Sequence, residues 1–422
     1  MFPVKENVKH QLGRMGETAK ALLLWLVMGS LVGVVCGVAG GAFHYAVDGA
    51  TFLRGNHPWL VYLLPAAGLI IVWTYRAWGM ENDSGTNQII ASVRSGKRPP
   101  LKLAILIFVG SALTHLAGGS AGREGAALQI GGSLASGVGR LFKLSERSMN
   151  MIVMCGMSGL FSALFGTPLT AAVFSMEVVS IGIFHYSALF PGLLSAYAAT
   201  GVTRLMGIKP EAYRLIGAPD LGWRPMVQVG ALGIVVALLS IVFCVIMHQS
   251  ARLYKKYLPN QNVRVVVGGI LVILLTMVVG NQNYNGTGNH IIEEAVSGHA
   301  VPWAFALKIV FTALTLGAGY RGGEIVPTLF VGATFGCTFA PLLGLNPAFG
   351  AAIGMIALFC GVVNCPLASI LLSVELFGSD AILFFALACG LSYMLSGKFS
   401  LYSSQKIVYS KLEPRFIDEH AH

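Results

Sequence analysis

Long apolar segments dominate this chain of 422 residues, of which 55% are hydrophobic and only 11% charged. A soluble protein of this size would carry about 25% charged residues. The composition therefore indicates an all-α integral membrane protein with room for about ten spanning segments. The mixed lengths of the segments predict tilted and re-entrant helices. The segments cover residues 21–47, 59–78, 101–119, 126–142, 149–181, 183–206, 227–249, 264–280, 302–319, 326–345, 347–377 and 380–396.

The net charge of +10 is concentrated at the chain ends and in the loops between apolar segments. This distribution argues against nucleic-acid binding, and the positive-inside rule predicts that both termini are cytoplasmic. We expect a multi-pass protein of the inner (plasma) membrane with a cytoplasmic N-terminal segment over residues 1–20 and a short tail over 400–422. No cytoplasmic regulatory domain is expected. The basic residues near the ends are Lys5, Lys9, Arg14, Lys20, Lys398, Lys406, Lys411 and Arg415.

Cysteine and histidine spacing gives no sign of a metal site or a cofactor. The seven cysteines lie in apolar context without a C-x-x-C pair, which is typical of small buried side chains. The ten histidines show no ligand spacing. Because no nucleophile–base pair stands out either, an enzyme is disfavoured.

An internal repeat divides the chain. FGTPLTAAVFSMEVV contains Pro168 and Glu177, and VNCPLASILLSVELF contains Pro366 and Glu375 at an offset of 198. The same offset carries Arg123 and Gly125 onto Arg321 and Gly323, and Asn87 matches Asn289 at an offset of 202. We predict two related membrane halves, roughly 20–210 and 225–400. An odd number of spans per half would invert them and bring their matching helix breaks face to face near the midplane.

Four carboxylates lie in or beside the apolar segments, where an ionised group costs roughly 2.5–3.5 kcal/mol. Glu124 and Glu324 each stand in a Gly-rich break before an apolar helix, in AGREGAALQIGG and YRGGEIVPTLFVGA. Such breaks aim helix N-termini at an anion. Glu177 and Glu375 end repeat-related helices, and we interpret them as structural, capping or pairing at helix ends.

The GREG segment and three further motifs resemble the CLC family of chloride channels and anion/proton antiporters. YRGGEIVP resembles the family's second anion-binding break, SLYSS its late tyrosine segment, and SGTNQII its first anion-binding loop. The resemblance covers about residues 20–410. It implies a CLC-like inverted repeat, a homodimer in the lipid bilayer and a secondary active transporter rather than an enzyme.

The resemblance also assigns roles to residues. Glu124 would be the gate and proton carrier, and Glu324 a second proton carrier. The anion would be bound by the backbone N–H groups of Glu324 and Ile325, by the Tyr402 hydroxyl and by Thr86. The helix breaks would be supported by Gly122, Arg123, Gly125, Gly322 and Gly323. The alternative for either glutamate is an ion pair that pins its break, between Glu124 and Arg123 or between Glu324 and Arg123 or Arg321.

Departures from the chloride-type pattern favour a different anion. Glu324 stands where chloride-type members have an apolar residue, and Val178 stands where they carry an inner glutamate. Both features resemble the bacterial fluoride/proton antiporters of the family. Thr86 matches neither residue associated with that branch, and residues 89–93 lack its phenylalanines. These two differences argue against fluoride. Because of Glu324 and Val178 we expect exchange of fluoride for protons, with a chloride/proton antiporter or a passive CLC-type anion channel as the alternatives.

Overall fold

The computed structural model describes residues 3–96, 98–413 and 415–421 and is mostly helical. The helices of the first half are α1 (Pro3–Asn56), α2 (Leu64–Ala77), α3 (Thr86–Ser95), α4 (Leu101–Leu116), α5 (Glu124–Leu141), α6 (Glu146–Phe165), α7 (Pro168–Glu177) and α8 (Leu189–Leu205). Those of the second half are α9 (Trp223–Tyr257), α10 (Gln261–Val279), α11 (Asn289–Val296), α12 (Ala304–Ala318), α13 (Ile325–Phe339), α14 (Pro347–Val363), α15 (Pro366–Phe377) and α16 (Ile382–Leu395).

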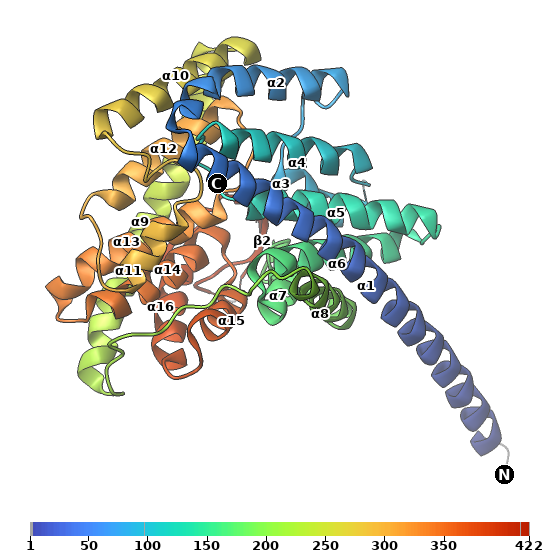
Figure 1. Ribbon diagram of the computed structural model, residues 1–422. Helices are drawn as coiled ribbons and strands as arrows, with labels where there is room; N and C mark the ends of the chain where they lie inside the picture. The colour runs from blue at the N-terminus through green and yellow to red at the C-terminus, as the bar shows by residue number, and fades with distance from the viewer. Residues whose placement is uncertain (1–2, 97, 414, 422) are drawn as a thin grey trace.

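The two halves repeat one arrangement of helices. Helix α1 packs on α8 as α9 packs on α16, and α5 packs on α6 as α13 packs on α14. Three helices contact their own counterparts across the boundary between the halves, namely α2 with α10, α7 with α15 and α5 with α13 (Figure 1). An approximate two-fold axis therefore runs between these pairs, as the predicted repeat requires.

The register of the repeat differs from the predicted one at the central break. An antiparallel bridge pairs Gly122 with Gly323, and α5 and α13 begin two residues later in each half. The true offset there is 201, so the predicted match of Arg123 with Arg321 is wrong by three residues. The difference is absorbed by the next helix, because α6 has 20 residues and α14 has 17. Beyond it, the prolines that begin α7 and α15 return to the predicted offset of 198.

Each of the two longest apolar segments folds as two helices separated by a sharp break. Helix α6 ends at Gly166 with φ +71°, and Pro168 begins α7. Likewise α14 ends at Asn364 with φ +58°, and Pro366 begins α15. The left-handed residue ends the first helix, and the proline, which lacks an N–H, suits the first turn of the next. Each of the two segments therefore gives one long and one short helix.

Glu177 of the first half caps a helix of the second half, and Glu375 of the second half caps a helix of the first. The Glu177 carboxylate accepts hydrogen bonds from the backbone N–H groups of Leu367 (3.2 Å) and Ala368 (2.9 Å) at the start of α15. The Glu375 carboxylate accepts from Leu169 (3.0 Å) and Thr170 (2.8 Å) at the start of α7. A carboxylate is stabilised by the positive end of a helix and satisfies two free N–H groups there. The capping interpretation of both residues is confirmed.

Glycines allow the helices flanking the central breaks to pack very closely. A Cβ added at Gly131 of α5 would lie 2.1 Å from the Gly156 carbonyl oxygen of α6. The matching contact of the second half, from Gly332 of α13 to Gly354 of α14, would be 2.4 Å. Small residues at such crossings are typical of helix packing in lipid. They leave α5 and α13 enclosed by protein rather than by lipid.

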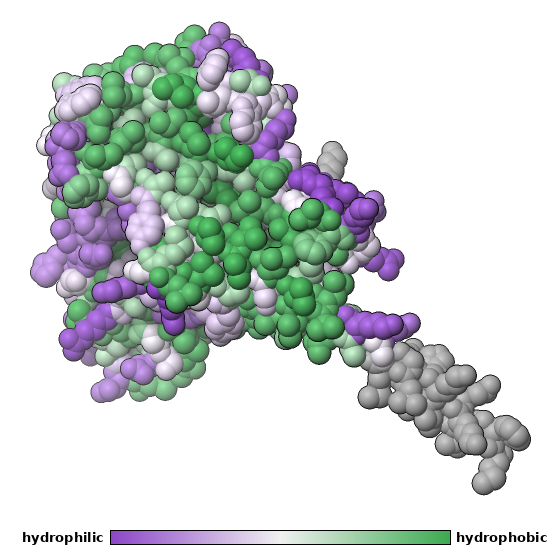
Figure 2. Space-filling view, turned by 45° about the vertical axis from the view of Figure 1, so that its right-hand side comes forward, coloured by the Kyte–Doolittle hydropathy of each residue, from purple (hydrophilic) through white to green (hydrophobic). Residues whose placement is uncertain are grey.

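The outer surface is apolar over a broad face. Figure 2 shows hydrophobic residues covering the centre of one side, with hydrophilic residues gathered toward its borders. Exposed side chains such as Trp73, Leu238 and Met277 would be costly in water. In the described residues, six helical stretches are long and apolar enough to cross a membrane: Gly16–Asn56, Pro58–Ala77, Glu146–Phe165, Trp223–Tyr257, Gln261–Val279 and Ile325–Leu343. The chain is a multi-pass membrane protein.

The chain ends differ from the expected layout in two respects. Helix α1 is continuous from Pro3 to Asn56, so the N-terminal segment predicted over residues 1–20 and the start of the first half share one helix from Pro3 onward. A small sheet, which an all-α prediction missed, joins β1 (Ser180–Ile181) in parallel to β2 (Lys406–Tyr409), and β2 antiparallel to β3 (Phe416–His420). Its core is formed by Ile181, Ile407 and Ala421. The sheet fastens the C-terminal segment to the end of the first half.

The reciprocal caps make a stability prediction. Glu375→Ala leaves two backbone N–H groups at the start of α7 unpaired, which costs about 1–3 kcal/mol. We expect a lower melting temperature in detergent, and a similar loss for Glu177→Ala. Glu146→Ala is the matched control, since Glu146 is an exposed carboxylate in the first turn of α6. Equal melting temperatures for Glu375→Ala and Glu146→Ala would contradict the capping role.

Candidate functional site

The two Gly-rich breaks meet at the centre of the molecule. The N–H of Gly122 donates to the Gly323 carbonyl oxygen and the N–H of Gly323 donates to that of Gly122, both at 2.7 Å. Matching bonds flank this bridge: the Ser120 N–H donates to Thr315 Oγ1 (3.0 Å), and the Arg321 N–H donates to Thr114 Oγ1 (3.3 Å). The first turns of α5 and α13 are thereby held against each other.

The contact between the breaks is as close as a backbone permits. A Cβ added at Gly125 would lie 2.8 Å from Gly323 Cα, so glycine is required there. Each helix leaves its first N–H groups without intrahelical partners and carries partial positive charge at that end. Two such ends beside each other form a region of positive potential to which backbone groups contribute.

Glu124 is completely buried in the first turn of α5. Its Oε2 accepts a hydrogen bond from the Arg123 N–H at 3.0 Å. Its Oε1 lies 3.5 Å from Arg123 Nε, outside ordinary hydrogen-bond geometry, and has no hydrogen-bond partner among the described residues. The carboxyl group therefore stands at the helix N-terminus with one oxygen available to bind or release a proton.

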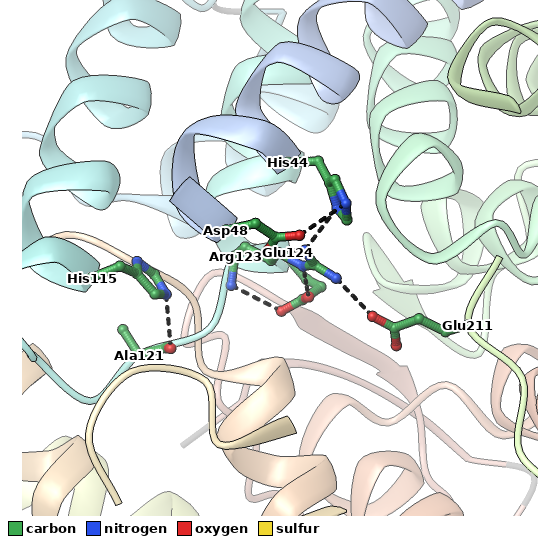
Figure 3. Close-up of polar contacts among 7 residues, drawn as sticks. All are labelled: His44, Asp48, His115, Ala121, Arg123, Glu124 and Glu211. Carbon is green, nitrogen blue, oxygen red and sulfur yellow. Dashed lines mark hydrogen bonds and ion pairs between the residues drawn. The ribbon is translucent and has the colours of Figure 1, made fainter. Parts of the chain in front are cut away.

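Arg123 uses the two Nη groups of its guanidinium for partners other than Glu124, which it meets only through Nε. Its Nη2 lies 2.7 Å from Glu211 Oε1, and its Nη1 lies 3.2 Å from Asp48 Oδ1 and 2.9 Å from His44 Nδ1. Figure 3 shows these partners arriving from two sides, with His44 and Asp48 on α1 and Glu211 on the segment that joins the two halves. The guanidinium is thus shared among several acidic groups.

Glu324 and Thr86 converge on Gly125. From a Cβ placed at Gly125, Glu324 Oε2 and Thr86 Oγ1 would each lie 3.4 Å away. The Thr86 hydroxyl donates to the Gly125 carbonyl oxygen at 3.1 Å, and Gln129 Nε2 donates to the same oxygen at 3.2 Å. Glu324 immediately precedes α13 as its N-cap, so its carboxyl group lies beside the N-terminus of that helix.

A cavity of about 760 Å³ reaches this point from the surface. Glu324, Thr86, Gln129 and Tyr402 line its inner end. Its lining also includes the basic side chains of Arg252, Lys255, Arg264 and Arg321. Glu324 is half-buried and faces this cavity, whereas Glu124 is not part of its lining. Of the two carboxylates, only that of Glu324 is therefore open to the cavity, while that of Glu124 is enclosed by protein.

Tyr402 brings a hydroxyl group to the same inner end. The side chain is 1% exposed, and its hydroxyl has no hydrogen-bond partner among the described residues. The backbone around it is fixed, since the Leu401 N–H donates to the Val362 carbonyl oxygen (2.9 Å) and the Ser404 N–H donates to Asn87 Oδ1 (2.9 Å). A buried, unpaired hydroxyl in a cavity is suited to donating a hydrogen bond to a ligand.

The predicted site residues therefore come together, on both sides of one bridge. Ile325 is buried in the first turn of α13, and Gly322 lies beside the bridge. Glu324 has no ion-pair partner in the described part of the chain, because Arg123 pairs as above and Arg321 pairs with Asp83 at 2.9 Å. The alternative in which an arginine pins Glu324 is not what the structure contains.

Three residues that contribute to the site were missed. Gln129 lies within the first motif, and its spacing from Gly125 of one helical turn is a signal for a hydrogen bond to that carbonyl group. Asp83 lies two residues before Gly85, in the loop already identified as resembling an anion-binding loop. Glu211 belongs to no motif, and nothing in the sequence connects it with Arg123.

Known proteins share this arrangement. A profile of the family described as "Voltage gated chloride channel" matches residues 67–397. A "Chloride/fluoride channel protein" of Pseudomonas syringae pv. tomato is 36% identical over 396 residues, covering 92% of this chain and 87% of the relative. This chain belongs to the CLC family.

Solved CLC structures support the same assignment. A CLC-type fluoride/proton antiporter superposes with a TM-score of 0.88 at 29% identity, over 91% of this chain and 98% of that one. A slow cyanobacterial Cl⁻/H⁺ antiporter superposes with a TM-score of 0.76 at 20% identity, over 88% and 94%, and at that identity shows the fold alone. The resemblance inferred from the four motifs is confirmed, and with it a family that contains anion/proton antiporters.

Proposed function

We propose that this chain is a secondary active transporter that exports fluoride in exchange for protons. The observation that carries the proposal is the position of Glu324. Its carboxyl group lies beside the N-terminus of α13, lines the cavity and has no ion-pair partner among the described residues. A passive channel has no need of a second carboxyl group at the site, whereas proton exchange requires carriers that reach both sides.

The two carboxyl groups divide the proton path between them. Glu124 is buried beside Arg123 and its partners, and Glu324 lines the cavity. Position 178, where chloride-type members carry an inner glutamate, is a fully buried valine in this chain. Glu324 then takes over the inner step, while Glu124 swings between the anion site and the outside.

The anion site offers donors without a full countercharge. Backbone N–H groups of Glu324 and Ile325 and the hydroxyl of Tyr402 are the candidate ligands, with Thr86 on the cavity side. Fluoride is strongly hydrated, so a site that replaces its water must provide compact donors. A protonated Glu324 carboxyl group supplies such a donor and links anion binding to proton uptake.

The basic side chains that line the cavity indicate the side of the membrane to which it opens. Its basic lining favours anions by raising the local positive potential, and clusters of lysine and arginine mark cytoplasmic loops. We therefore assign the cavity to the cytoplasm and the Arg123 network to the outside, with both chain termini cytoplasmic and the protein in the inner membrane. The homodimer implied by the family belongs to the same proposal.

The relatives favour fluoride over chloride. The Pseudomonas relative is named for both ions, and the structure with the TM-score of 0.88 is a fluoride/proton antiporter. Both share more sequence with this chain than the cyanobacterial Cl⁻/H⁺ antiporter described above and an H⁺/Cl⁻ exchange transporter of Yersinia pestis, which is 26% identical.

Glu324→Gln tests the proposal. The amide keeps the shape of the side chain but cannot carry a proton, so we expect fluoride-driven proton movement to fall at least tenfold in proteoliposomes while the melting temperature stays near that of the parent. Glu124→Gln should also abolish proton movement, since the other carrier is lost. Normal coupled flux with a lowered melting temperature would make Glu324 a structural residue and remove the argument for fluoride.

Thr86 tests the selectivity of the site. Because its hydroxyl lies at the inner end of the cavity beside Gly125, we expect Thr86→Ser to shift preference toward chloride and Thr86→Met to leave fluoride preferred. The measurement is the ratio of fluoride to chloride flux under equal gradients. Identical ratios in the parent and both variants would remove Thr86 from the selectivity argument.

A further inference from the structure

The segment that joins the two halves, residues 206–222, is fixed to both of them. The Glu211 N–H donates to the Phe165 carbonyl oxygen at the end of α6 at 2.9 Å. The Tyr213 N–H donates to the Leu376 carbonyl oxygen near the end of α15 at 2.8 Å. These bonds hold the backbone on both sides of Glu211. The Glu211 side chain therefore reaches Arg123 at the central break from a backbone that is held in place.

The Glu211 side chain makes the shortest ion pair of Arg123. The distance between Glu211 Oε1 and Arg123 Nη2 is 2.7 Å, compared with 3.2 Å to Asp48 and 3.5 Å to Glu124. The Glu211 side chain is 20% exposed and the Asp48 side chain 54% exposed. Solvent screens the pair with Asp48 more strongly, so Glu211 is the principal partner of the guanidinium.

We propose that Glu211 is a positioning residue that holds the Nη2 end of Arg123 and offsets its charge beside Glu124, and so sets the external acidity at which the Glu124 gate is released. This inference rests on the proposed role of Glu124. Without the Glu211 carboxylate, the Arg123 guanidinium would have Glu124 as its nearest buried acidic neighbour. Both the freed positive charge and the lost negative charge would stabilise ionised Glu124 in the anion site.

His115 is a further titratable group near Glu124, and it does not contact Glu211. His115 of α4 is fully buried, with its ring nitrogens 2.8 Å from the Ser111 carbonyl oxygen and 3.1 Å from that of Ala121, so its contacts do not involve Glu211. Among the described residues, the titratable and charged groups around Glu124 and its Arg123 partner are His44 and Asp48 of α1, His115, Glu211, Tyr213 and Tyr402.

The test is anion flux measured against external pH for Glu211→Gln in proteoliposomes. We expect the pH of half-maximal flux to move to lower values by on the order of one unit, since a nearby negative charge that opposes ionisation of Glu124 has been removed. Glu211→Asp retains the charge and should restore most of the parent profile. Glu293→Gln is the matched control, because it removes an exposed carboxylate near Tyr213 that does not contact Arg123.

Combining the variants separates positioning from support of the loop. In a Glu124→Gln background, Glu211→Gln should change neither the rate of anion flux nor its pH dependence, because the residue it acts through is gone. An unshifted pH profile in the single variant, or the same fractional loss of flux in both backgrounds, would overturn the proposal. Anion flux is measured without reference to proton movement, so a failure of proton coupling would count against the proposed exchange and not against Glu211.

Discussion

Two hydrogen bonds between Gly122 and Gly323 fix the point on which the rest of the structure depends. They join two helix breaks that lie 201 residues apart in the chain, and they do so with backbone groups that would otherwise be unpaired inside the membrane. The bridge sets the ends of α5 and α13 against each other and requires glycine at Gly125. It also places Glu124 and Glu324 close to one contact, each within two residues of a bridging glycine.

The two halves stabilise some of their carboxylates in equivalent ways, but they differ in charge at the central break. Glu177 and Glu375 are equivalent and each caps a helix of the other half, which gives a structural role to one buried and one half-buried carboxylate. At the central break the equivalent N-cap positions hold Arg123 and Glu324, a cation on one side and an acid on the other. This asymmetry allows one face of the site to be tied into an ion-pair network while the other faces an open cavity.

Much of this could be predicted from the sequence, because lipid leaves few choices of backbone structure. The Gly-rich breaks, the prolines that begin α7 and α15, and the position of Tyr402 follow from motifs and composition. The offset at the central break could not be predicted. It depends on a difference of three residues between the lengths of α6 and α14, and both helices lie in apolar segments without a motif that marks their ends. The contact of Glu211 with Arg123 could not be predicted either, because it depends on a loop that is held by backbone hydrogen bonds to two helices distant in the sequence. The sheet at the C-terminus was missed because its strands are short and one of them follows α7.

The most direct test of the account is a single proteoliposome experiment on the unaltered protein that follows fluoride, chloride and protons together. With an outward fluoride gradient and no proton gradient, the account predicts that fluoride leaving through the protein drives protons inward. An equal chloride gradient should move far fewer protons. Fluoride flux that proceeds with no proton movement, or chloride that drives protons as well as fluoride does, would contradict it.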